Sequence, residues 1–277
     1  MEKLQKAIAE ARKSRAGAST GKTAGAPGRG KPQGATSERG ETLWDDIKQM
    51  NPDARHMTRN RIVSHKADTA SSSFDVLRTK VMQQMQQNGW KRLMITSPMP
   101  GCGKTTLAAN LAYGVSRQGA KSAILMEFDL RKPNLSNILG VKPNHDIRDV
   151  LTGQVSFQDQ ALRIGQNVAV SMASRRSADP TRYLTSDETQ HQLRAIEEAY
   201  DPDMMIFDMP PLLVNDDARS FLPYTDCVLL VARAESSTSK QIDVCEKEVA
   251  EQTNVVGVVL NHCRFVDETQ GYGYGGY

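Results

Sequence analysis

The sequence predicts an α/β domain in which a mostly parallel sheet is covered by helices on both faces. Six uninterrupted apolar runs of strand length recur between residues 91 and 261, and helical stretches separate most of them. Parallel strands that are buried on both faces have such continuous apolar runs, because crossover helices shield them from water. A glycine-rich segment, PGCGKTT at residues 100–106, lies between the first run and the next helical stretch.

The elements follow from periodicity. A helix is expected over residues 73–87, where Phe74, Leu77, Val81 and Met85 recur on one face and serines of the capping type open the pattern. Further helices are expected at 105–119 and 190–200. The expected strands are, in chain order, 91–97, 122–128, 167–173, 204–209, 227–233 and 255–261.

Three regions are expected along the chain. Residues 1–70 are interpreted as a basic, largely flexible extension, since residues 14–40 are rich in Gly, Ala, Ser and Pro. Within it, residues 3–15 have the spacing of a short amphipathic helix. Residues 71–266 form the α/β domain, and residues 267–277 form a tyrosine-rich tail.

The composition indicates a soluble globular protein, with 39% hydrophobic and 24% charged residues. No apolar run approaches the roughly 18 residues that a membrane span needs, and the start lacks the apolar core of a secretory signal. The four cysteines, at 102, 227, 245 and 263, have no paired spacing. They are expected to be free thiols in a reducing cytoplasm rather than disulfides or zinc ligands.

The net charge of +3 is unevenly distributed. Residues 1–66 contain 14 Lys or Arg and 7 Asp or Glu, a net charge of +7, so the rest of the chain is acidic. A basic arm suits contact with anionic lipid or nucleic acid, although a solvated tail is the simpler interpretation. Nucleic-acid binding is disfavoured, because Trp44 is the single aromatic residue among these charges.

The glycine-rich segment has the chemistry of a phosphate-binding loop. Gly101 and Gly103 let successive N–H groups turn inwards and form an anion-binding nest at the start of a helix. Lys104 would reach the β- and γ-phosphates, and the Thr105 hydroxyl would bind Mg²⁺. The pattern G-x-x-x-x-G-K-[ST] fails at one position, where Pro98 stands in place of the first glycine.

Acidic residues follow two of the expected strands. Asp208 ends one apolar run, while Glu127 and Asp129 lie two residues apart at the end of another. Mg²⁺ prefers oxygen ligands, and a second carboxylate could accept a proton from an attacking hydroxyl. These residues predict binding of Mg·ATP or Mg·GTP, without by themselves indicating a kinase.

Four motifs together resemble the bacterial tyrosine kinases that govern capsule and exopolysaccharide production. SPMPGCGKTT resembles their phosphate loop, EFDLRKP their second motif (usually D-x-D-x-R) and IFDMPP their Walker B motif. The terminal YGYGGY resembles their cluster of autophosphorylated tyrosines. The resemblance covers roughly residues 71–277 and implies the P-loop NTPase fold of the MinD/ParA type, with ATP and Mg²⁺ as cofactors.

The resemblance also implies roles for individual residues. It makes Lys104, Glu127, Asp129 and Asp208 catalytic, with Glu127 as the base, and makes Thr105, Asp129 and Asp208 the metal ligands. The implied nucleotide-binding residues are Pro100, Gly101, Cys102, Gly103, Lys104, Thr105, Thr106, Arg131 and Asn261. The implied autophosphorylation sites are Tyr272, Tyr274 and Tyr277.

Two departures from the family pattern keep alternatives open. Glu127 replaces the usual Asp, which displaces its carboxylate by one methylene. The ring-forming helix, usually E-x-x-R-x-x-R, has Ser72, Asp75 and Arg78 at the matching positions, so the expectation of a homo-oligomer rests on Arg78 alone. A catalytically degenerate, nucleotide-dependent scaffold of polysaccharide export is therefore one alternative.

A positioning ATPase of the MinD/ParA type is the other alternative. It is disfavoured because Met99 and Pro100 stand where that class has K-G-G-x-G-K-T with its signature lysine. The preferred function is an ATP-dependent tyrosine autokinase that regulates exopolysaccharide synthesis and export. The resemblance implies a cytoplasmic protein recruited to the inner face of the membrane by a membrane-embedded polysaccharide co-polymerase or activator. Direct membrane contact is expected only through the basic arm.

Overall fold

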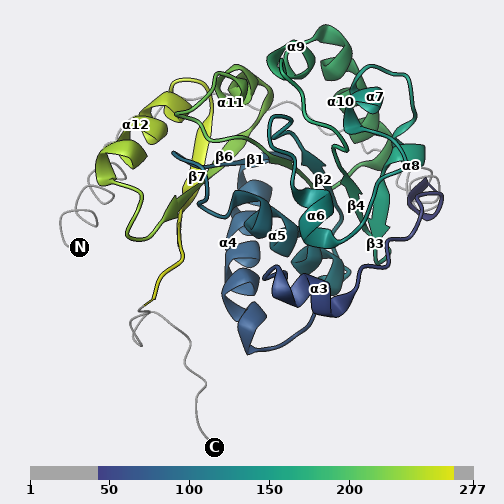
Figure 1. Ribbon diagram of the computed structural model, residues 1–277, viewed down its shortest axis with the longest axis horizontal. Helices are drawn as coiled ribbons and strands as arrows, with labels where there is room; N and C mark the ends of the chain where they lie inside the picture. Colours follow the sequence, from purple (N-terminus) through teal and green to yellow (C-terminus); the bar gives the residue numbers. More distant parts are fainter. Residues whose placement is uncertain (1–42, 265–277) are drawn as a thin grey trace, which may run out of the picture. The chain divides into compact units, whose positions relative to one another are not determined.

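A seven-stranded sheet forms the centre of the computed structural model, which describes residues 43–264 (Figure 1). The strand order is β3-β4-β2-β5-β1-β6-β7, and every neighbouring pair is parallel except β3 with β4. The strands are β1 (Arg92–Thr96), β2 (Ala123–Glu127), β3 (Leu162–Ile164), β4 (Val168–Ser171), β5 (Met204–Asp208), β6 (Cys227–Arg233) and β7 (Asn254–Asn261). The predicted α/β class and all six predicted strands are confirmed.

Helices cover both faces of this sheet, so that two apolar cores form, one on each side (Figure 1). On one face lie α3 (Ala54–Arg59), η1 (Thr69–Ser71), α4 (Ser72–Asn88), α5 (Lys104–Gln118) and α6 (Leu135–Leu139). On the other lie α7 (Ile147–Leu151), α8 (Phe157–Gln160), α9 (Thr181–Leu184), α10 (Asp187–Tyr200), α11 (Asp217–Phe221), η2 (Leu222–Tyr224) and α12 (Ser239–Ala250). None of the helices within residues 43–264 is both long and apolar enough to cross a bilayer.

Among the strands of residues 43–264, β3 is the one that the sequence did not predict. It has three residues and pairs antiparallel with β4 at the edge of the sheet. Its central residue is Arg163, whose guanidinium forms an ion pair with Asp45. A three-residue strand with a charged centre has too few apolar residues to stand out from a loop.

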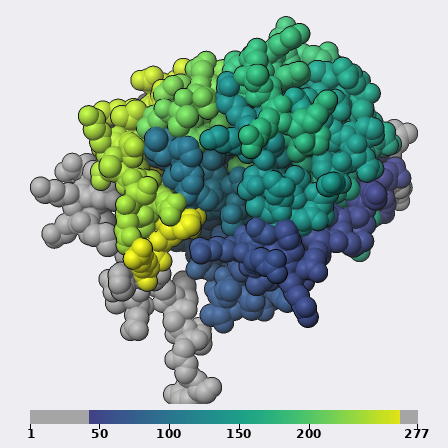
Figure 2. Space-filling view, viewed as in Figure 1, coloured from purple at the N-terminus to yellow at the C-terminus, as the bar shows by residue number. Residues whose placement is uncertain are grey.

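Residues 43–70 belong to the folded domain, which corrects the predicted domain boundary at residue 70. Trp44, Ile47, Met57 and Ile62 are all buried in the two cores. Figure 2 shows this purple segment lying directly against the teal residues of the domain. The sequence misled because these apolar residues are widely spaced among charged ones. The predicted amphipathic helix at 3–15 lies outside the described residues.

A buried asparagine of α5 holds this segment in place. The Asn110 side chain accepts hydrogen bonds from the backbone N–H groups of Val63 (2.9 Å) and Ser64 (3.0 Å). Its amide donates to the carbonyl oxygens of Arg61 (2.9 Å) and Thr106 (2.8 Å). All the hydrogen-bonding capacity of a fully buried side chain is thereby used.

Replacing Asn110 by alanine is expected to lower the free energy of unfolding by about 3 kcal/mol, because buried backbone N–H groups lose their acceptor. Urea denaturation measures this change. Asn88→Ala is the matched control, since Asn88 is an exposed asparagine at the end of α4 and its loss should change stability by less than about 0.5 kcal/mol. Equal stability of the two variants would contradict the role given to Asn110.

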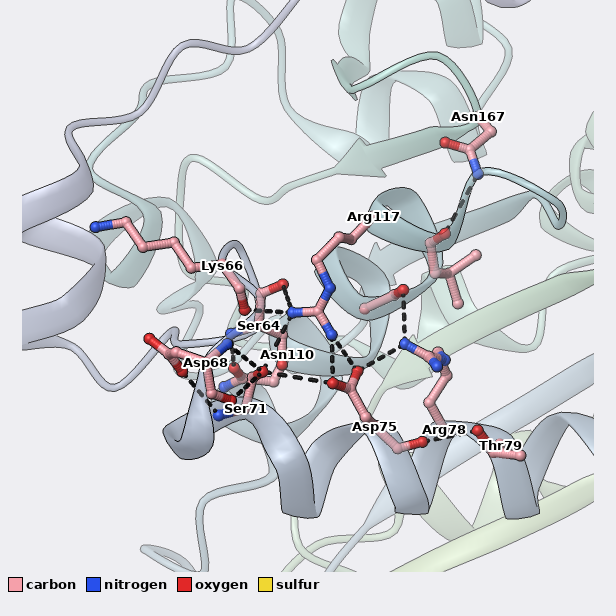
Figure 3. Close-up of polar contacts among 12 residues, drawn as sticks. Ser64, Lys66, Asp68, Ser71, Asp75, Arg78, Thr79, Asn110, Arg117 and Asn167 are labelled. Atoms are coloured by element: carbon pink, nitrogen blue, oxygen red, sulfur yellow. Dashed lines mark hydrogen bonds and ion pairs between the residues drawn. The ribbon is translucent and has the colours of Figure 1, made fainter. Parts of the chain in front are cut away.

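An ionic network joins α4 to α5 (Figure 3). The Asp75 carboxylate accepts hydrogen bonds from Arg78 at 2.7 Å and from the Arg117 guanidinium. Arg78 is buried and donates also to the carbonyl of Gly114 at 3.0 Å, while Arg117 donates to the carbonyl of Ser64. Arg78, the residue on which the expected ring depended, is therefore engaged by groups of its own chain.

Candidate nucleotide site

The carboxyl ends of three neighbouring strands meet beside the glycine-rich loop. In the sheet, β5 lies between β1 and β2, and Asp208 is level with Ile95 on one side and Glu127 on the other. The loop leaves β1 and enters α5, which begins at Lys104. A cleft of about 590 Å³ opens at this edge. Ligands of open parallel sheets bind at such edges, where loops diverge.

Tight packing determines the conformation of the loop. Gly101 and Gly103 have φ of 78° and 92°, which lie in the region that favours glycine. A Cβ atom on Gly103 would lie 2.3 Å from Nδ2 of Asn261. That nitrogen donates to the Cys102 carbonyl oxygen at 2.9 Å, and Arg233 donates to the Gly101 carbonyl oxygen at 3.2 Å. Residues at the ends of β6 and β7 thus hold the loop through hydrogen bonds to its carbonyl groups.

Most of the predicted nucleotide-binding residues line the cleft. These are Pro100, Gly101, Gly103, Lys104, Thr105, Thr106 and Arg131, together with the predicted catalytic residue Asp129. Two predicted contacts are placed differently. The Cys102 side chain is buried and its Sγ contacts the Met99 carbonyl oxygen, while Asn261 supports the loop without lining the cleft.

Asp208 lies beneath the cleft, fully buried, and neither of its carboxylate oxygens has a hydrogen-bond partner of normal geometry within residues 43–264. Burial raises the pKa of Asp208 to about 7, against the opposing effects of Lys104 and the nearby Thr105 hydroxyl. A buried carboxylate without partners is costly unless a cation compensates it. The residues therefore fit Mg²⁺. No cluster of three or more His, Cys, Asp or Glu occurs in the described part of the chain, so phosphate and water oxygens would complete the shell.

Asp129 is the carboxylate that faces the cleft. It is 9% exposed and accepts a hydrogen bond from the Lys132 backbone N–H at 3.1 Å. Burial raises its pKa, and the positive charge of Lys104 opposes the rise. Lys104 itself is buried at the start of α5, and its positive charge acts on the pKa of both acids.

Glu127 is not in the cleft, which corrects its predicted place as the base. One of its oxygens accepts the N–H groups of Asn134 and Leu135, both at 2.6 Å, at the start of α6. The other accepts the N–H of Ala173 at 3.0 Å. Burial raises the pKa of Glu127 to about 8, partly offset by the bond from Leu135. The longer side chain thus ties α6 and the end of β4 to β2.

Shortening this side chain, Glu127→Asp, is expected to lower the free energy of unfolding by about 2 kcal/mol, because the carboxylate no longer reaches all three amides. Urea denaturation measures the change, with the exposed Glu188→Asp as control. If Glu127 were instead the base, Glu127→Asp should retain or increase phosphotransfer, since aspartate is the usual residue in the family that the motifs resemble. A variant of undiminished stability and faster phosphotransfer would contradict the structural role.

Arg131 has a structural partner as well as a place in the cleft. Its guanidinium donates to the fully buried Asp217 at 2.5 and 3.0 Å, and Asp217 also accepts from the Thr181 hydroxyl at 2.7 Å. This pairing joins the end of β2 to α9 and α11. The sequence did not single out Asp217, because an acidic residue at a helix start is common on surfaces.

Several cleft residues were missed by sequence reasoning. They are Lys132, Pro133, Asn134, Asn137, Arg176, Pro210, Pro211, Val214 and Asn215. The proline pair was visible in the motif IFDMPP, but Arg176 comes from the loop after β4, which contains no recognised pattern. The tyrosines Tyr272, Tyr274 and Tyr277 lie outside the described residues.

Comparison with known proteins identifies similar nucleotide-binding domains. Residues 93–270 match the CobQ/CobB/MinD/ParA nucleotide binding domain family. The kinase domain of the Escherichia coli tyrosine kinase ETK has a similar structure, with a TM-score of 0.64 and 26% identity over 76% of this chain and 82% of that domain. The cell division ATPase MinD of Pyrococcus furiosus is less similar, with a TM-score of 0.53 and 26% identity over 64% of this chain and 74% of that protein.

Curated relatives are tyrosine-protein kinases. YwqD of Bacillus subtilis is 28% identical over 223 residues, which are 79% of this chain and 92% of YwqD. Etk of Escherichia coli K12 is 27% identical over 212 residues, which are 75% of this chain and 29% of Etk. The chain spans less than a third of the length of the first relatives that it matches.

Proposed function

Since the chain belongs to the CobQ/CobB/MinD/ParA nucleotide-binding family and, within it, to the bacterial tyrosine kinases, we propose that it transfers the γ-phosphoryl group of ATP to tyrosine. The observation that supports this most directly is the cleft, where a phosphate loop, Lys104 and two buried acids converge. The acceptors would be Tyr272, Tyr274 and Tyr277 of a second copy, where glycine residues separate the tyrosines in the sequence.

The residues of the cleft have three roles in this reaction: binding the triphosphate, holding the metal and accepting a proton. The loop N–H groups and Lys104 hold the triphosphate, and Thr105 and Asp208 would hold Mg²⁺, which supplies positive charge to the transferred phosphoryl group. Asp129, which the sequence also assigned to the metal, faces the cleft and accepts the phenolic proton. The phenolate oxygen bonds to the γ-phosphorus as the bond to the β-phosphate oxygen breaks, and ADP leaves.

Regulation of exopolysaccharide synthesis belongs to the same proposal, as does a membrane-embedded activator that recruits the kinase to the inner face of the membrane. Each phosphate on the tail adds roughly −1.5 to −2 charges, enough to loosen an assembly of copies by repulsion. The basic residues before residue 43 would assist contact with the membrane or the activator.

Mass spectrometry after incubation with Mg·ATP tests the proposal. Phosphate on Tyr272, Tyr274 or Tyr277 supports an autokinase. ATP hydrolysis with nucleotide-dependent dimerisation and no phosphotyrosine would instead indicate a positioning ATPase. Nucleotide binding with neither outcome, even when the cytoplasmic segment of a membrane activator is supplied, would indicate a scaffold.

A further inference from the structure

A second hollow of about 560 Å³ adjoins the nucleotide cleft. Asn137 of α6 lines both of them, and the same two segments, 132–143 and 174–176, contribute to both walls. The lining residues of the second hollow are His56, Ser136, Asn137, Gly140, Val141, Lys142, Pro143 and Ser174. A ligand in this hollow would therefore lie beside the nucleotide cleft.

The hollow is built by close contact between α3 and α6, which Figure 1 shows side by side. Gly140 ends α6 with φ of 68°, and a Cβ atom there would lie 2.7 Å from the His56 ring. Nε2 of His56 lies 2.8 Å from the Asn137 carbonyl oxygen and 3.0 Å from Nδ2 of Asn60. The segment that the sequence assigned to a flexible extension thus forms one wall of the hollow.

The charge around the two hollows is positive. Lys142 lines the second hollow, and Lys132 and Arg176 line the adjoining side of the cleft. All three are exposed, and none forms a salt bridge within residues 43–264. No carboxylate of the described residues lines the second hollow, and the nearby Asp146 already pairs with Arg148 at 2.7 Å. We call Lys132, Lys142 and Arg176 the basic groove.

We propose that the basic groove binds acidic residues that precede the acceptor tyrosine, so that the enzyme selects acidic tyrosine peptides. The proposed function assigns the phosphates of ATP to the loop and Lys104, so the cations of the basic groove are available to another anionic ligand. This inference rests on the proposed kinase function and names its substrate class.

The chain itself carries such a sequence. Asp267 and Glu268 precede Tyr272 by five and four residues. Four extended residues span roughly 13 Å, and the two hollows that would hold the acids and the phenol share Asn137 in their walls. Polar Ser136, Asn137 and Ser174 beside apolar Val141 and Pro143 suit the backbone and side chains of a peptide.

Binding of two peptides to the full-length chain tests the inference. The first has the sequence of residues 264–277, and the second carries Asp267→Asn and Glu268→Gln. With a non-hydrolysable ATP analogue present, fluorescence anisotropy should give a dissociation constant about fivefold lower for the acidic peptide, as expected for one or two partly exposed ion pairs. Equal affinities would overturn the proposal.

The variant Lys142→Glu provides the second measurement. It should remove the preference for the acidic peptide and leave ATP affinity unchanged, whereas the control Lys240→Glu, on exposed α12 surface, should change neither. A peptide with Asp267→Lys and Glu268→Lys should bind the Lys142→Glu protein more tightly than it binds the wild-type protein. An unchanged acidic preference in Lys142→Glu would overturn the proposal.

Phosphorylation of the same peptides separates this inference from the proposed activity. If peptide binding depends on charge as expected but no peptide gains phosphotyrosine, the result supports peptide binding by the basic groove and contradicts the kinase function. If the wild type binds acidic and neutral peptides equally and phosphorylates them with equal KM, the result supports the kinase function and contradicts the proposed role of the basic groove.

Discussion

Replacing Lys104 by methionine is expected to lower the rate of phosphotyrosine formation by at least about 100-fold. Its ammonium group is the positive charge closest in sequence to the loop glycines, and it acts on both Asp129 and Asp208. Removal of a single preorganised charge that stabilises a transition state typically costs this much. Initial rates at saturating Mg·ATP measure the effect.

The same substitution should also lower the stability of the nucleotide-free protein, because two buried carboxylates lose their counter-charge. Lys240→Met, at an exposed position on α12, is the control for loss of a lysine. A Lys104→Met variant that retained wild-type phosphotransfer would remove the phosphate loop from the mechanism.

Replacing Asp208 by asparagine is expected to have opposite effects on activity and on stability. Phosphotransfer should fall by about 100-fold or more, since the metal loses its buried carboxylate. The free energy of unfolding of the nucleotide-free protein should rise by about 2 kcal/mol at pH 8, because the substitution removes a buried charge that accepts no hydrogen bond of normal geometry from residues 43–264.

The sign of the pH dependence follows from the pKa. The pKa of Asp208 rises from 3.8 to about 7 on folding, because burial penalises the charged form. The cost to the folded state therefore accumulates as pH rises from about 4 through 7 and is fully present above 7. The stability gain of Asp208→Asn should shrink towards pH 5, and Asp243→Asn, at an exposed position on α12, is the control for loss of a carboxylate. A gain of equal size at pH 5 and pH 8 would contradict this account.

A stability gain at the cost of function is the behaviour expected of a metal site. Within residues 43–264 neither oxygen of Asp208 accepts a hydrogen bond of normal geometry, whereas the neighbouring Glu127 accepts three. The two carboxylates lie level with each other on β5 and β2 and differ entirely in their surroundings. In thermal denaturation, addition of Mg·ATP should accordingly raise the melting temperature of the wild type more than that of Asp208→Asn.

The sequence by itself determined the parallel sheet, the phosphate loop and eight of the seventeen residues that line the cleft. Apolar runs of strand length and the order of glycine, lysine and threonine are local patterns, and each depends on residues that are close in the chain. The place of Lys104 at a helix start and of Asp208 at a strand end followed from the same local patterns.

The tertiary structure alone decided which of the two acids on this segment, Glu127 or Asp129, faces the cleft. Glu127 and Asp129 are two residues apart, and their surroundings differ because the amides of Asn134, seven residues along the chain, and of Ala173, 46 residues along it, close around Glu127. Likewise, residues 43–70 contain sparse apolar side chains whose burial depends on α5 and on the far edge of the sheet. Local patterns carry no information on such partners, because the partners are brought together only by the fold.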